Sequence, residues 1–142
     1  MVNRMSVLVA ARLAAFLGVF GCAFALSGCG DRSGTQYNVS GTVTFGGEPV
    51  PAGQILLAPD TSKGNSGPAT IVTIRNGKYD TREANRGTGG GPHVVTITGY
   101  DGKPDPGGEL PDGRILFSDY HIEVDLPNES TTKDFDVPST HR

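Results

Sequence analysis

The sequence has no tryptophan, two cysteines and three histidines among its 142 residues. These scattered thiol and imidazole groups provide no set of four ligands for a tetrahedral zinc site. Without tryptophan, and with Tyr37, Tyr100 and Tyr120 far apart along the chain, no aromatic platform for a sugar is evident. The formal net charge is −3 and no stretch is rich in Lys and Arg, which argues against nucleic acid as a partner.

Long hydrophobic runs are missing too, with one exception near the start of the sequence. The fourteen residues 13–26, LAAFLGVFGCAFAL, are apolar without interruption, follow Arg4 and Arg12, and precede the first acidic residue, Asp31. As a helix they would rise about 21 Å, which is short of the ~30 Å hydrocarbon core of a bilayer. The pattern is typical of a secretory signal peptide. A buried core helix or an uncleaved anchor is the alternative.

The residues that follow the apolar segment form a more specific pattern. Leu26, Ser27, Gly28 and Cys29 resemble the lipobox of bacterial lipoproteins. This resemblance implies that a diacylglycerol is transferred to the Cys29 thiol and that the signal is cut just before it. We therefore predict that residues 1–28 are a lipoprotein signal peptide and that Cys29 anchors the chain to a membrane of a bacterial cell envelope. The alternative is a free or disulfide-bonded Cys29 in a soluble secreted protein.

The mature chain would start at Cys29. Cys22 lies in the segment to be removed, so no internal disulfide could form. Residues 29–142 contain 10 Lys or Arg and 15 Asp or Glu, a net charge of −5, so attachment to an anionic membrane must come from the lipid. We predict a lipidated tether over residues 29–36 and one domain over residues 37–142.

The predicted domain consists of short runs of alternating polar and apolar residues between Gly- and Pro-rich turns. The runs place Val39 and Val43, Ile55 and Leu57, and Val95 and Ile97 on buried faces, with Tyr79 as an isolated anchor. Asn76-Gly77 predicts a two-residue hairpin turn. RILF (114–117) and HIEVDL (121–126) read as separate strands. Seven or eight such runs without a helical period predict an all-β protein with a single antiparallel β-sandwich of about seven strands, Ig-like or prealbumin-like.

Three stretches together resemble the carboxypeptidase regulatory-like, or transthyretin-like, β-sandwich. They are GTVTFGGEPVPAGQILLAP (41–59), GKYDT (77–81) and GPHVVTI (91–97). The positions that match the family pattern are Gly41, Val43, Phe45, Gly47, Pro49, Val50, Gly77 and Tyr79, whereas His93 stands where the family usually has Tyr. The fold recurs in small bacterial lipoproteins. Its enzymatic branch, the hydroxyisourate hydrolases, ends in Tyr-Arg-Gly-Ser, a motif absent from PSTHR (138–142), so the resemblance implies no catalytic residue here.

Two further clusters contain residue types with known chemistry. Ser118, Asp119 and His121 are the residue types of a nucleophilic triad. Neighbouring side chains on a strand point to opposite faces, so Asp119 and His121 would share one face and Ser118 would lie on the other. This favours an ordinary polar edge over a catalytic site. Asp101, Asp105, Glu109 and Asp112 carry oxygen ligands suited to calcium in a spacing that differs from the EF-hand. They are the candidates for a weak calcium site.

These observations predict a membrane-anchored, non-enzymatic lipoprotein without a cofactor. We expect a structural or protein-interaction role, with an envelope protein as partner. The alternative is a module that binds a small ligand, calcium or a glycan through loops at one end of the sandwich.

Overall fold

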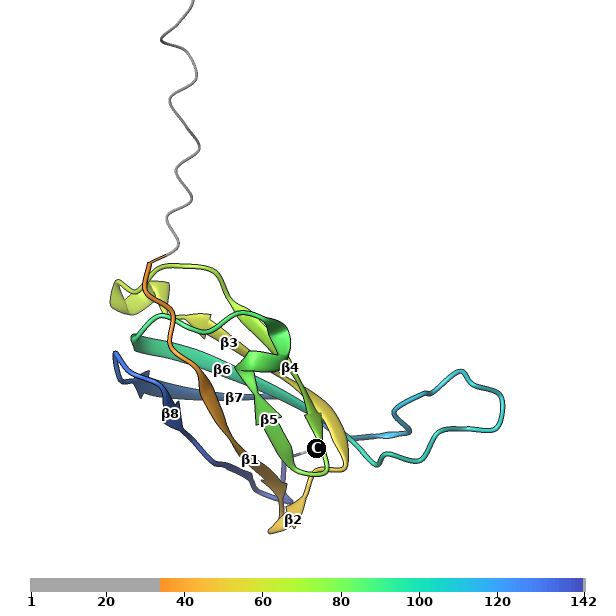
Figure 1. Cartoon of the computed structure of the whole chain (residues 1–142). Helices are drawn as coiled ribbons and strands as arrows, with labels where there is room; N and C mark the ends of the chain where they lie inside the picture. Colours follow the sequence, from red (N-terminus) through yellow and green to blue (C-terminus); the bar gives the residue numbers. More distant parts are fainter. Residues whose placement is uncertain (1–33, 142) are drawn as a thin grey trace, which may run out of the picture. The chain divides into compact units, whose positions relative to one another are not determined.

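The computed structural model describes residues 34–141, which form an all-β domain (Figure 1). The predicted signal peptide, the lipobox and Cys29 lie outside the described residues. The strands are β1 (Val39–Phe45), β2 (Glu48–Pro49), β3 (Ala52–Pro59), β4 (Thr70–Arg75), β5 (Lys78–Asp80), β6 (Gly91–Tyr100), β7 (Ile115–Leu126), β8 (Thr131–Thr132) and β9 (Phe135–Val137). Two short 3₁₀ helices, η1 (Thr61–Lys63) and η2 (Thr81–Ala84), follow β3 and β5. Among the described residues, no helix is long and apolar enough to cross a membrane.

The main strands form a curled antiparallel sheet in the order β2-β1-β5-β4-β3-β6-β7. This arrangement confirms the predicted β-sandwich class with about seven strands. Two pairings depart from the antiparallel expectation, because β8 and β9 both pair with β1 in parallel. Ser40 pairs with Asp80 of β5 on one side and with Thr132 of β8 on the other, so β8 covers an edge that β1 would otherwise expose.

The two strands predicted at residues 114–117 and 121–126 are a single strand, β7. The prediction of a break between them was wrong because the chain passes the interruption through a bulge. The pairing with β6 shifts between Ile97 and Gly99, and Asp119 adopts a positive φ of 53°. A bulge inserts an extra residue without ending the ladder. The polar residues there interrupt the pattern of the sequence but not the strand.

Period-two alternation predicted the core correctly. Val39, Val43, Ile55, Leu57, Val95 and Ile97 are at most 1% exposed, and Tyr79 is 3% exposed. Phe117 and Phe135 also belong to this core, where Tyr79 and Phe135 pack with ring centroids 6.0 Å apart. The Asn76-Gly77 turn also forms as predicted, with φ values of 49° and 72° and with Arg75 opposite Lys78. Two successive positive φ values match the right-handed twist of the flanking strands.

Candidate functional site

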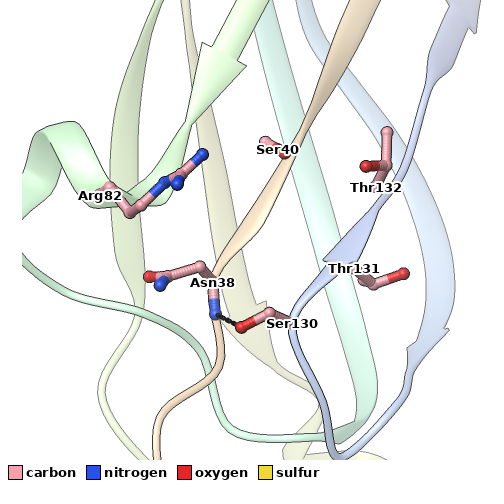
Figure 2. Close-up of a pocket in the computed structure, with 6 residues that line it drawn as sticks. All are labelled: Asn38, Ser40, Arg82, Ser130, Thr131 and Thr132. Atoms are coloured by element: carbon pink, nitrogen blue, oxygen red, sulfur yellow. Dashed lines mark hydrogen bonds between the residues drawn. The ribbon is translucent and has the colours of Figure 1, made fainter.

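An open polar groove runs along the outward side of β1. Its first part is a surface pocket of about 420 Å³ lined by Asn38, Ser40, Arg82, Ser130, Thr131 and Thr132. Figure 2 shows Arg82 on one side of β1, with Thr131 and Thr132 on the other. The groove forms because alternate residues of β1 point outward, while η2 and β8 flank the strand. All six side chains are polar, and we call this surface the β1 groove.

The β1 groove continues into a second pocket of about 660 Å³ that shares Ser40 and Thr132. The side chains that carry charge in this part are Arg75, Lys78, Asp80, Glu83 and Asp134. Asp80 accepts hydrogen bonds from Arg82 Nε at 2.9 Å and from an Arg82 terminal nitrogen at 2.6 Å. This pairing lowers the pKa of Asp80 and raises that of Arg82. Both groups therefore stay ionised and neutralise one another.

The carboxylate of Asp134 accepts hydrogen bonds from neutral donors of β1. Its Oδ1 accepts hydrogen bonds from the Thr42 amide at 2.7 Å and from the Thr42 hydroxyl at 2.8 Å. The Thr42 hydroxyl and amide lower the pKa of Asp134. A carboxylate held ionised by neutral donors is a poor proton acceptor near pH 7, because its conjugate acid is disfavoured.

The floor of the β1 groove contains a close approach between two chain segments. The Tyr79 hydroxyl donates to the Lys133 carbonyl oxygen at 2.7 Å, and this carbonyl lies directly over Gly41. A Cβ at residue 41 would lie 2.0 Å from the Lys133 oxygen, so only glycine fits there without a shift. Burial and the nearby Asp134 raise the pKa of Tyr79, which keeps its phenol protonated and available as a donor.

The Ser118-Asp119-His121 cluster does not have the geometry of a catalytic triad. The three residues are exposed, and both nearby imidazoles contact backbone oxygens. His121 Nδ1 contacts the carbonyl oxygen of Asp119, and His141 Nε2 contacts that of Ser118 at 2.9 Å. A general base must instead reach the hydroxyl of its nucleophile. This arrangement is the polar edge that the sequence favoured.

The predicted calcium residues lie in a loop that projects from the end of the sheet (Figure 1). Asp101 Oδ1 accepts from the amides of Lys103 at 3.0 Å and Arg114 at 2.9 Å, and these bonds lower the pKa of Asp101. The carboxylate of Asp105 accepts from the amides of Gly107 and Leu110 at 3.1 and 2.6 Å. These two carboxylates close the loop on itself.

Glu109 and Asp112, the other two predicted calcium ligands, are exposed on the same loop. Over residues 34–141, no group of three or more His, Cys, Asp or Glu side chains could hold a metal ion. The structure therefore does not gather the four residues into a binding site.

His93, the departure from the family pattern, is 1% exposed, and its Nδ1 contacts the Gly91 carbonyl oxygen at 2.9 Å. It is a packed core residue.

The sequence alone did not point to the β1 groove. Its residues come from three segments, 38–42, 75–83 and 130–134, and none of them carries a recognisable ligand motif. The one available signal was Gly41, a glycine inside an otherwise alternating strand, which often marks a close backbone approach.

Comparison of the sequence with protein-family models and with curated proteins finds no match.

Proposed function

We propose that this chain is a lipoprotein anchored through Cys29 to a membrane of the bacterial cell envelope, where its β-sandwich is a non-enzymatic interaction module. The observation that carries the proposal is the sequence Leu26-Ser27-Gly28-Cys29 directly after a basic start and an apolar segment. The β-sandwich begins a few residues later, at Val39. Such spacing suits a domain held close to a membrane by a short polar tether.

The non-enzymatic role is supported by the chemistry of the β1 groove. Its carboxylates Asp80 and Asp134 are held ionised by donors, and the Tyr79 phenol is held protonated. None of these groups has a pKa moved toward neutrality, as acid–base catalysis would need. The polar surface remains suited to recognition.

The assignment to a transthyretin-like domain is part of the same proposal. It is supported by the roles of two residues in the matching pattern, since Gly41 makes room for the Lys133 carbonyl and Tyr79 donates to it. These roles explain why a glycine and a tyrosine suit these positions.

The test is the intact mass of the protein purified from membrane fractions, beside a Cys29→Ala variant. We expect a species that begins at Cys29 and carries two or three acyl chains, and we expect it to be absent from the variant. An unmodified chain in the soluble fraction would overturn the proposal.

A second candidate function is the binding of a polar ligand, such as a glycan, in the β1 groove. The observation that favours it is the concentration of amide and hydroxyl side chains in one open pocket, with Asn38, Ser40 and Thr132 among them. Retention on a polysaccharide resin that Ser40→Val and Thr132→Val each reduce would support this function. Equal retention of the variants and the unmodified protein would refute it.

A further inference from the structure

The two edges of the sheet differ in how they are covered. β1 is flanked by β8 and β9, whereas β7, within residues 34–141, pairs with β6 alone. With 12 residues, β7 is the longest strand described. A long edge strand presents a row of unpaired backbone groups that can template another strand. This edge is therefore a candidate binding surface.

The direction of the Pro92 carbonyl in β6 fixes which residues of β6 face β7, and therefore which backbone groups of β7 point away from β6. The Pro92 carbonyl accepts from the amide of Asp60, at the end of β3, at 2.9 Å, so Pro92 faces β3. Because backbone groups alternate in direction along a strand, His93 and Val95 face β7 and pair there with Val124 and Ile122.

The intervening residues of β7 must then turn their backbone groups the other way. His121, Glu123 and Asp125 direct their N–H and C=O groups away from β6, toward the open side of the sheet. Their side chains are also exposed. Three consecutive outward-facing positions can provide up to about six backbone hydrogen bonds to an added strand, at two per position.

The side chains along this edge define the kind of strand that would fit. On the outer face, Glu123 and Asp125 carry negative charge, and Lys63 Nζ pairs with the Glu123 carboxylate at 2.6 Å. On the inner face, Ile122 and Val124 pack against the core but remain partly exposed. An added strand would place alternate side chains beside these two rows.

A second copy of this chain fits the edge poorly. Antiparallel self-pairing centred on Glu123 would place two Glu123 carboxylates opposite one another. A register that pairs Glu123 with Asp125 would again place carboxylates opposite one another. Like charges directly opposite one another destabilise a strand pair. The carboxylates thus disfavour self-pairing and favour a basic partner.

We infer that residues 121–126 of β7 bind an extended segment of another protein, in which Lys or Arg alternates with aliphatic residues, by adding it to the sheet as a further strand. The inference rests on the interaction role proposed above but not on the lipid anchor. Backbone hydrogen bonds would provide affinity, and the acidic and apolar rows would select the partner.

The test measures binding of two synthetic peptides to the full chain in detergent. The first peptide is Lys-Ile-Lys-Val-Lys-Ile-Lys, and the second carries Glu in place of each Lys. We expect the basic peptide to bind, the acidic peptide to bind at least 10-fold more weakly, and amide NMR shifts to concentrate at residues 121–126. Equal binding of both peptides, or shifts elsewhere, would overturn the inference.

Two variants of the same edge sharpen the result. Glu123→Pro removes an outward N–H without removing a bond to β6, so it should reduce binding at least 10-fold. Asp125→Lys, which keeps every backbone donor, should weaken the basic peptide and strengthen the acidic one. Asp112→Lys, in the projecting loop, is the matched control and should leave binding within 2-fold. Asp125→Lys keeps the test informative if Glu123→Pro fails to fold.

The remaining outcomes separate this inference from the proposed function. A dimer that dissociates when Asp125→Lys is introduced would overturn the inference, because a second copy would then be the occupant. If the peptide does not bind while the mass confirms acylated Cys29, the inference fails and the anchor stands. If the peptide binds to a chain whose Cys29 is unmodified, the anchor fails and the inference stands.

Discussion

Substitution of Gly41 by alanine tests the junction between β1 and the segment that leads into β9. The added Cβ would lie 2.0 Å from the Lys133 carbonyl oxygen and 2.7 Å from its carbon. The φ of Gly41 is not positive, so the cost is a steric clash with a neighbouring backbone rather than local strain. To accept alanine, the segment around Lys133 must move away from β1 by about 1 Å or more.

The size of the effect follows from what that movement breaks. It would lengthen the 2.7 Å hydrogen bond from Tyr79 to Lys133 and leave a buried phenol without its acceptor. Loss of a buried partner costs about 1–3 kcal/mol, and overpacking costs about the same. We therefore expect Gly41→Ala to lower the free energy of unfolding by about 2–6 kcal/mol.

Urea denaturation followed by circular dichroism measures this change. Gly89→Ala is the matched control, because a Cβ there meets nothing within 4 Å, and it should alter stability by less than about 0.5 kcal/mol. Tyr79→Phe closes a double-mutant cycle, and its cost should shrink when Gly41 is already replaced. A Gly41→Ala protein as stable as the parent, or an undiminished cost of Tyr79→Phe in it, would refute the reasoning.

Three other perturbations give distinct results. Ile97→Asp buries an unpaired charge and should abolish the cooperative unfolding transition. The control Thr96→Asp places the charge on the outer face of the same strand and should show a normal thermal transition. A folded Ile97→Asp protein would contradict the assignment of Ile97 to the core. Stability should fall as the pH drops below about 4, because the folded-state pKa of Asp134 lies below its unfolded value of 3.8. Urea titrations at several pH values should show a smaller fall for Asp134→Asn, with the remainder due to other carboxylates of lowered pKa such as Asp80 and Asp101. Calcium should leave the melting temperature unchanged, because the carboxylates of the projecting loop do not gather; a rise that a chelator reverses would instead support a calcium site there.

The core was predictable because it depends on a local property of the chain. Side chains of a strand alternate between two faces, so burial of Val43 or Ile97 could be read without knowing which strand lies beside it. The Asn76-Gly77 turn was predictable for a similar reason, since two residues tolerant of positive φ suffice to set the hairpin.

The pairing of β8 and β9 with β1 could not be read in this way. The hydrogen bonds that join Thr42 to Asp134 and Thr44 to Asp136 link residues 92 positions apart. β8 is polar and lacks the buried face that specifies register, and the buried residues of β9, Phe135 and Val137, indicate a strand but not which strand lies beside it. The β1 groove depends on this pairing, so it too was invisible in the sequence.

The parallel pairing of β1 also gives the sheet its asymmetry. β8 and β9 occupy the open side of β1, and Lys133 and Asp134, which connect them, bind the backbone of β1 and the Thr42 side chain. A strand protected in this way needs no charge to prevent association, and the outward-facing residues of this segment in the β1 groove, Asn38, Ser40 and Thr42, are uncharged. Among the described residues, no strand pairs with the outer side of β7, and its residues 121–126 carry Glu123 and Asp125 instead. Charges on an edge strand prevent indiscriminate pairing while leaving the backbone available. The same two carboxylates that keep β7 from pairing with itself therefore make it selective for a basic strand.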